Sequence, residues 1–213
     1  MHSYHTLFGV LSALIALVSY IPYFRSILKG ESKPSRATFG TWSFIGIVET
    51  ASYAASGARA TVWLPIVYAI GDISVFILSF KRGMGGKQPL DILCLLGAVA
   101  GIVCWAITKD PRLALYLSMS ASACGFIPTL RKVYVLPQSE NRTTWAMDIA
   151  AAACNLVAVA HLNSYLVLYP LYTLVFDSGV VGLMMMPRRV QHSTTVRPTR
   201  RARQRVRPAL QRA

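Results

Sequence analysis

Long apolar stretches, separated by short polar segments, fill the first 186 residues of the chain. A helix rises about 1.5 Å per residue, so about 20 apolar residues are needed to cross the roughly 30 Å of hydrocarbon in a bilayer. A helix also satisfies its own backbone hydrogen bonds where water is absent. Seven stretches meet that length: 6–27, 38–57, 60–80, 89–108, 111–132, 144–163 and 165–186. The pattern predicts an all-α membrane protein with seven transmembrane helices and short connections.

The basic residues between these stretches are distributed unevenly. The connections after the first, third and fifth stretches carry Arg25, Lys29, Lys33, Arg36, Lys81, Arg82, Lys87, Arg131, Lys132 and Arg142. The opposite side carries only Arg59, Lys109 and Arg112. Short loops rich in Lys and Arg stay in the cytoplasm. We therefore expect a multi-pass protein of the plasma (inner) membrane, with its N-terminus outside and its C-terminus cytoplasmic.

Composition agrees with this picture and excludes several classes of protein. Hydrophobic residues make up 54% of the chain and charged residues only 14%, against roughly 45–50% and about 25% in soluble domains. These values exclude a disordered protein and a typical nucleic-acid-binding domain. The net charge is +14, but nine of the 22 Lys and Arg residues lie in the segment 187–213. We expect this segment to be a disordered cytoplasmic tail that contacts anionic lipid, and we expect no nucleic-acid partner.

Matching residues recur along the chain at a spacing of about 106 positions. The matched pairs are Pro22 with Pro128, Arg36 with Arg142, Glu49 with Asn155, Pro65 with Pro170, and Asp72 with Asp177. The repeat predicts two three-helix bundles, residues 1–82 and 111–186. Because three is odd, a linker helix within residues 83–110 is needed to give both bundles the same orientation. The expected architecture is therefore 3+1+3, followed by the tail 187–213.

This arrangement, with a proline in the first helix of each half and a basic loop after it, resembles the SWEET and PQ-loop (MtN3-like) superfamily of membrane transporters. The residue after Pro22 is Tyr23 and the residue after Pro128 is Thr129, where the family motif has glutamine. The resemblance implies two parallel repeats about an axis along the membrane normal. It also implies that the third helix of each half lines a central solute site, where these relatives have asparagine and this chain has aspartate.

Ionisable residues inside the apolar stretches are the candidate binding residues, because each costs at least ~2.5–3.5 kcal/mol at the bilayer centre. The candidates are Asp72, Asp177, Glu49 and Asn155, at similar expected depth, with Tyr68 and Thr173 one helical turn before the two aspartates. Without a Lys or Arg at that depth, the carboxyl groups could bind a proton or accept hydrogen bonds from a hydroxylated or cationic solute. The alternative is that they join helices to one another. We expect Asp91 and Asp148, in the first turns of their helices, to interact only with the helix dipole.

Four prolines lie in or beside these helices and are candidate hinges: Pro22, Pro128, Pro65 and Pro170. Each removes a backbone hydrogen bond and permits a kink. Their paired positions favour hinges for alternating access, although simple packing kinks would have the same signature.

The leading functional hypothesis is a transporter or facilitator of a small polar solute, such as a sugar, an amino acid or a cation, with or without proton coupling. It would work by alternating access around a polar site at mid-depth. The alternatives are a membrane receptor, such as the architecturally similar KDEL receptor, or a lipid-associated scaffold. Catalytic motifs such as HExxH and GxSxG are absent from the sequence, so we expect no enzyme, cofactor or metal site. Homo-oligomer formation remains open.

Overall fold

The computed structural model describes residues 2–83, 89–160 and 163–186. Within these residues every regular element is a helix. The seven α-helices are α1 (His2–Lys29), α2 (Arg36–Ala55), α3 (Trp63–Arg82), α4 (Pro89–Thr108), α5 (Pro111–Val135), α6 (Arg142–Val157) and α7 (Ser164–Met185). Two short 3₁₀ helices, η1 (Ala60–Val62) and η2 (Pro137–Ser139), precede α3 and α6. The all-α prediction is confirmed for this part of the chain.

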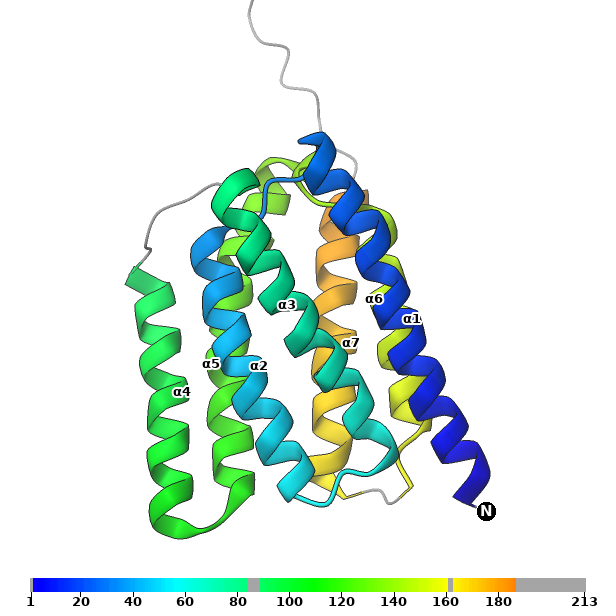
Figure 1. Cartoon of the computed structure of the whole chain (residues 1–213), viewed down its shortest axis with the longest axis vertical. Helices are drawn as coiled ribbons and strands as arrows, with labels where there is room; N and C mark the ends of the chain where they lie inside the picture. Colours follow the sequence, from blue (N-terminus) through cyan, green and yellow to red (C-terminus); the bar gives the residue numbers. More distant parts are fainter. Residues whose placement is uncertain (1, 84–88, 161–162, 187–213) are drawn as a thin grey trace, which may run out of the picture.

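Successive helices alternate in direction, so that α1, α3, α5 and α7 run one way and α2, α4 and α6 run the other (Figure 1). Several of the packed pairs join segments that are far apart in the sequence. Helix α1 packs along α6, and α2 packs along α5. Helix α3 lies against α1 and α2, α7 lies against α5 and α6, and α4 lies against α5 and α2. Residues of α1–α3 and α5–α7 therefore meet in one interior.

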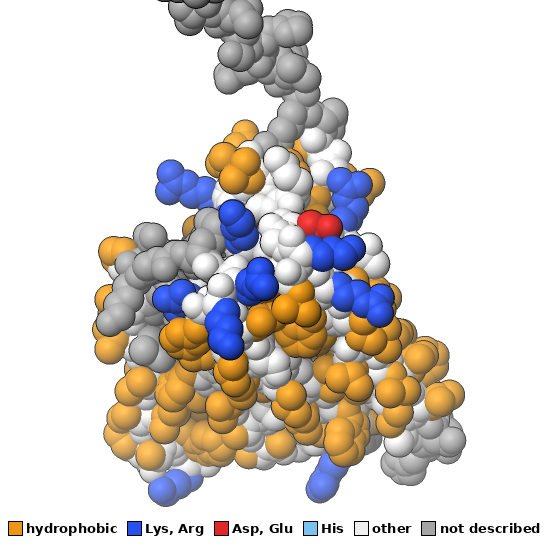
Figure 2. Space-filling model, turned by 45° about the horizontal axis from the view of Figure 1, so that its top comes forward, with side chains coloured by type: hydrophobic (Ala, Val, Ile, Leu, Met, Phe, Trp, Pro, Cys, Tyr) orange, Lys and Arg blue, Asp and Glu red, His pale blue; other side chains and the backbone are white. Residues whose placement is uncertain are grey.

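Among the described residues, four helices are long and apolar enough to cross a membrane: Tyr4–Lys29, Ala60–Arg82, Pro111–Val135 and Tyr165–Met185. Large apolar side chains cover the flanks of the bundle (Figure 2), and Ile77 and Ile107, for example, are 64% and 75% exposed. In water an apolar surface of this extent would be energetically costly, whereas in a bilayer it contacts apolar lipid chains. These features support a membrane protein.

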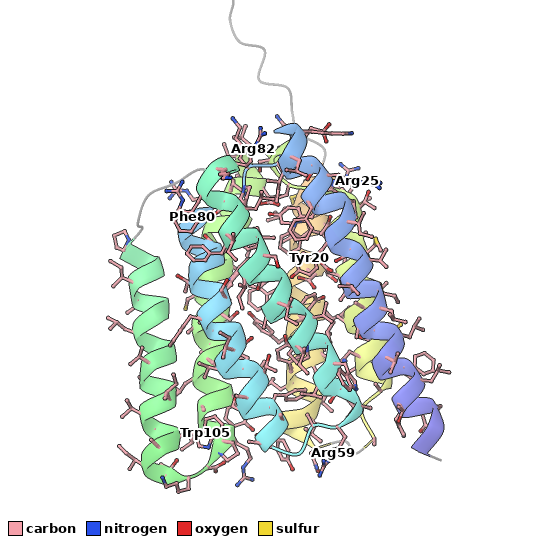
Figure 3. The ribbon with its side chains drawn as sticks, in the orientation of Figure 1. Tyr20, Arg25, Arg59, Phe80, Arg82 and Trp105 are labelled. Atoms are coloured by element: carbon pink, nitrogen blue, oxygen red, sulfur yellow. The ribbon has the colours of Figure 1, made fainter. Side chains whose placement is uncertain are left out.

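Basic side chains gather at one end of the bundle (Figure 2). Arg25 and Arg82 lie at this end and Arg59 lies at the opposite end (Figure 3). We call these the basic end and the Arg59 end. The unequal distribution follows the one expected from the sequence. The basic segment 187–213, expected to contact lipid, lies outside the described residues.

Helix α6 differs most from its expected extent of 144–163. It begins at Arg142 and ends at Val157, so its 16 residues span only about 24 Å at the helical rise. The N–H group of Ala158 bonds to the carbonyls of both Cys154 and Asn155, which closes the last turn. The apolar run continues beyond this point, so hydrophobicity alone could not mark the end of the helix.

The matched arginines of the repeat have equivalent structural positions. Arg36, the first residue of α2, donates through Nη2 to the carbonyls of Ser79 and Phe80, each at 3.4 Å. Arg142, the first residue of α6, donates in the same way to the carbonyl of Met184 at 3.3 Å. Each arginine therefore donates to carbonyl groups in the last turn of α3 or α7, where a helix leaves carbonyls without regular partners; the Ser79 carbonyl also accepts from the Gly83 N–H group at 2.8 Å.

Candidate binding cavity

An internal cavity lies between six of the seven α-helices, with α4 the exception among the described residues. The centres of water-sized molecules can occupy about 90 Å³ of it. A single buried water needs roughly 10–15 Å³ of such space, so the cavity has room for several water-sized groups. Tyr20 points from α1 toward this interior (Figure 3).

Four carboxyl groups line this cavity, each from a different helix: Glu49 from α2, Asp72 from α3, Asp148 from α6 and Asp177 from α7. Asp72 and Asp148 both lie within electrostatic reach of Asp177. In the described part of the chain, the lining contains no Lys, Arg or His side chain. Removing one carboxylate from water costs several kcal/mol, so four uncompensated charges could not coexist here. The cavity must hold protons on its carboxyl groups, or a cation.

Asp72 has a hydrogen-bonding partner on α1. The hydroxyl group of Tyr20 lies 3.3 Å from Asp72 Oδ1 and 3.3 Å from the Tyr68 carbonyl oxygen. This approach depends on Gly71, because a Cβ atom there would lie 1.9 Å from the Tyr20 ring. The missing side chain at Gly71 lets Tyr20 pack flat on α3, directly beside the carboxyl group.

Asp148 also has its partner on α1. Ser19 Oγ lies 2.6 Å from Asp148 Oδ1 and 2.8 Å from the Ala16 carbonyl oxygen. A serine hydroxyl has only one hydrogen to donate. Both contacts are therefore full hydrogen bonds at the same time only when Asp148 carries a proton and donates it to Ser19.

Several buried polar atoms at the cavity have no hydrogen-bonding partner. They include the indole Nε1 atoms of Trp42 and Trp145, Glu49 Oε1 and the hydroxyl group of Tyr68. A buried polar atom without a partner costs about 1–3 kcal/mol. Such atoms are retained where water or a ligand satisfies them, so they make the cavity a candidate binding site.

Five of the six predicted binding residues line the cavity: Asp72, Asp177, Glu49, Tyr68 and Thr173. Tyr68 and Thr173, which lie one helical turn before the two aspartates, do not hydrogen-bond to them. The partner of Asp72 is Tyr20 rather than Tyr68. Thr173 donates within its own helix, to the carbonyls of Tyr169 and Pro170 at 3.3 and 3.1 Å.

The structure does not bring Asn155 to the cavity. Its side chain is fully buried, and Nδ2 donates to the carbonyl oxygen of Thr61 at 3.1 Å. Because α6 ends at Val157, Asn155 lies in the last turn of the helix rather than near its middle. Asn155 is the fourteenth residue of α6, as Glu49 is of α2, so the two differ in the length of their helices and not in their distance from the basic end.

Among the described residues, Asn155 and Tyr53 each bond to the carbonyl group four residues before a proline. Pro170 has no N–H group, so the Leu166 carbonyl four residues earlier has no helical donor. Tyr53 of α2 supplies one, with its hydroxyl group 2.7 Å from that oxygen. Thr61 stands in the same relation to Pro65, and its carbonyl accepts from Asn155 of α6. We call these two bonds the crossed caps, because α2 caps α7 and α6 caps α3.

The four prolines expected to be hinges lie at different places in their helices. Pro65 is the third residue of α3, in the first turn of the helix, where proline is well tolerated. Pro170 lies inside α7 and Pro22 lies inside α1. The side chain of Pro128 lies outside the described residues. Hinge motion at these prolines remains a prediction.

The sequence-based interpretation missed Asp148, which was expected only to interact with the dipole of α6. It is the seventh residue of α6 rather than part of the first turn, because the helix begins at Arg142, and it lines the cavity. The overlooked signal is Asn141, whose side chain accepts from the Thr144 N–H group as an N-cap. Identifying that cap would have placed Asp148 deeper. Tyr20, the partner of Asp72, was also missed.

The chemistry available to this cavity is hydrogen bonding, proton binding and cation binding. In the part of the chain that the structure describes, no three His, Cys, Asp or Glu side chains are arranged to hold a metal ion. Comparison of the chain with protein-family models, with curated proteins and with solved structures gave no match. The case for a function therefore depends on the geometry of the cavity.

Proposed function

We propose that the protein is a membrane transporter or facilitator that moves a small polar solute by alternating access around this cavity. One observation carries the proposal. Four carboxyl groups from four helices share one internal cavity that has no basic side chain among the described residues, inside a bundle with an apolar surface. Buried acids are expensive in a membrane, and solute pathways and proton relays are where they are usually found.

The proposal includes seven membrane-spanning helices, arranged as two equivalent halves, residues 1–82 and 111–186, with residues 83–110 as a linker helix. Three features support this arrangement: the alternating helix directions (Figure 1), the corresponding packing of α1 on α6 and of α5 on α2, and the corresponding caps from Arg36 and Arg142. The resemblance to the SWEET and PQ-loop superfamily points the same way. By the distribution of basic residues, the Arg59 end faces outward and the basic end faces the cytoplasm.

Alternating access requires that each end of the bundle can open. The crossed caps hold the Arg59 end closed, because opening it separates α2 from α7 and α6 from α3. Hydrogen bonds between membrane helices contribute about 0.6 kcal/mol on average and about 1.7 kcal/mol at most, so two such bonds form a reversible closure. Toward the basic end, the rings of Trp42 and Phe126 meet across α2 and α5, with centroids 4.6 Å apart. We assign the inner closure to these rings.

The test is solute flux into proteoliposomes, screened with sugars, amino acids, organic amines and protons at two pH values. We expect Asp148→Asn and Asp177→Asn to lower uptake at least tenfold. Asp110→Asn is the matched control, because Asp110 lies outside the cavity, and its uptake should equal that of the unaltered protein. Equal uptake by all of these variants would contradict the proposal. Solute binding without flux would favour a receptor of the same architecture.

A further inference from the structure

We propose that the solute of this cavity is a small organic ammonium ion that carries no acid group. The inference builds on the proposed function, because it names the solute class for the same cavity. Three properties of the lining lead to it: its charge, its aromatic rings and the spacing of its carboxyl groups.

The charge of the lining selects the sign of the solute. Its ionisable acids are Glu49, Asp72, Asp148 and Asp177, and no Lys, Arg or His faces them from the described helices. A cationic solute balances this charge directly. A solute that carries its own carboxylate, such as an amino acid, would place a further negative charge among the acids without a partner. The lining therefore favours an amine over a zwitterion.

The aromatic rings provide a second kind of contact for a cation. Nine of the lining residues are Phe, Tyr or Trp. Phe126 lies between the two indoles, with ring centroids 4.6 Å from Trp42 and 6.2 Å from Trp145. The face of an aromatic ring attracts a cation within about 6 Å, and tryptophan does so most strongly. Neutral sugars would not use this property.

The spacing of the carboxyl groups disfavours an inorganic ion. Calcium needs six to eight oxygen ligands at about 2.3–2.6 Å, and magnesium needs a near-octahedral set. The four carboxyl groups come from four helices, and within the described residues no three of them are arranged as metal ligands. An organic cation is larger and can contact separated acids and rings together. The available space limits it to a few heavy atoms.

The unpartnered polar atoms fit the same class of solute. Glu49 is 4% exposed, and its Oε1 atom accepts no hydrogen bond within the structure. It can therefore accept one from an ammonium group. The indole N–H groups of Trp42 and Trp145 have no acceptor and can donate to a hydroxyl group on the same solute. Choline combines these two features and is a suitable probe.

The experiment measures binding to purified protein in detergent by tryptophan fluorescence. Trp63→Phe and Trp105→Phe remove the two indoles outside the cavity, so that Trp42 and Trp145 report from its wall. The probes are choline, its neutral isostere 3,3-dimethylbutan-1-ol, and glycine betaine, which adds a carboxylate. We expect saturable quenching by choline and tetramethylammonium, with affinities for the isostere and the betaine at least tenfold weaker.

Variants test the two contacts separately. Trp145→Leu should weaken choline binding at least tenfold, whereas Trp145→Tyr, which keeps an aromatic face, should retain most of it. Asp148→Asn should also weaken it at least tenfold, and Asp110→Asn should leave it unchanged. Thermal melting of each variant confirms that the protein is folded. Equal affinity for choline and its isostere, or binding by no ammonium probe, would overturn the inference.

The binding assay separates this inference from the proposed function, because binding in detergent requires no flux. Ammonium binding without uptake would remove transport and keep the solute class. Uptake of protons or sugars without ammonium binding would keep transport and remove the solute class.

Discussion

The Tyr53 hydroxyl group offers a sharp test of the crossed caps. Tyr53 is fully buried and donates to the Leu166 carbonyl at 2.7 Å, which Pro170 leaves without its helical donor. In Tyr53→Phe the carbonyl loses its only side-chain donor in the structure. An unsatisfied buried group costs about 1–3 kcal/mol, and the largest measured bonds between membrane helices are about 1.7 kcal/mol. We therefore expect Tyr53→Phe to lower the free energy of unfolding by about 1–2 kcal/mol.

A double-mutant cycle with Pro170→Ala isolates this bond. Alanine restores an N–H group at position 170, which can donate to Leu166 within α7. In that background Tyr53→Phe should cost less than about 0.5 kcal/mol, giving a coupling energy near 1 kcal/mol. Unfolding by added dodecyl sulfate, followed by circular dichroism, gives the four free energies. Tyr68→Phe is the matched control, because the Tyr68 hydroxyl group has no partner.

We also expect Tyr53→Phe to lower the melting temperature. For a chain of this size, 1 kcal/mol corresponds to about 2–4 °C, so Tyr53→Phe should melt roughly 2–8 °C lower in a reversible scan. If Tyr53→Phe cost the same with proline and with alanine at position 170, its hydroxyl group would not be replacing the missing donor. The crossed-cap interpretation would then be refuted.

Three further predictions follow from other contacts. Arg112 hydrogen-bonds to Asp110 and holds the pKa of that carboxyl below its usual value of 3.8; this stabilisation, present above that pH, should be lost as the pH falls through the lowered pKa, and thermal melting of Asp110→Asn should lack the loss because asparagine has no carboxyl group to protonate, while it can still cap α5. Gly71→Ala should displace the Tyr20 ring and weaken solute binding several-fold, measured by fluorescence titration, and unchanged affinity would count against the Tyr20 contact. Arg142→Ala should lower the stability of α7 by up to about 1 kcal/mol, seen as faster hydrogen exchange in its last turn and not in α3.

The length of the apolar stretches was enough to predict the helices, because a long apolar segment is a property of local composition. The position of individual side chains along their helices was harder to predict from the sequence. That Asn155 lies in a last helical turn was not predicted, because α6 ends six residues before the predicted stretch 144–163 does. Asp148 was misjudged because its depth depends on where the N-cap Asn141 starts the helix.

The partner of Asp72 could not be predicted from sequence at all. Tyr20 lies in an apolar stretch, where a tyrosine looks like any core aromatic residue. Its contact with Asp72 depends on the packing of α1 against Gly71 of α3, which is a tertiary feature. The crossed caps are similar, because the need for a donor can be read from Pro65 and Pro170, whereas the donors come from other helices.

The central claim is that the cavity is open in turn to both sides of the membrane. Ser122 lines the cavity and is 7% exposed, so a single cysteine there, with Cys94, Cys104, Cys124 and Cys154 replaced by alanine, reports its accessibility. Oriented vesicles are treated with a membrane-impermeant thiol reagent from one side or the other, with and without choline. We expect labelling from both sides, slowed by choline. Labelling from one side only, or none from either side, would contradict the central claim.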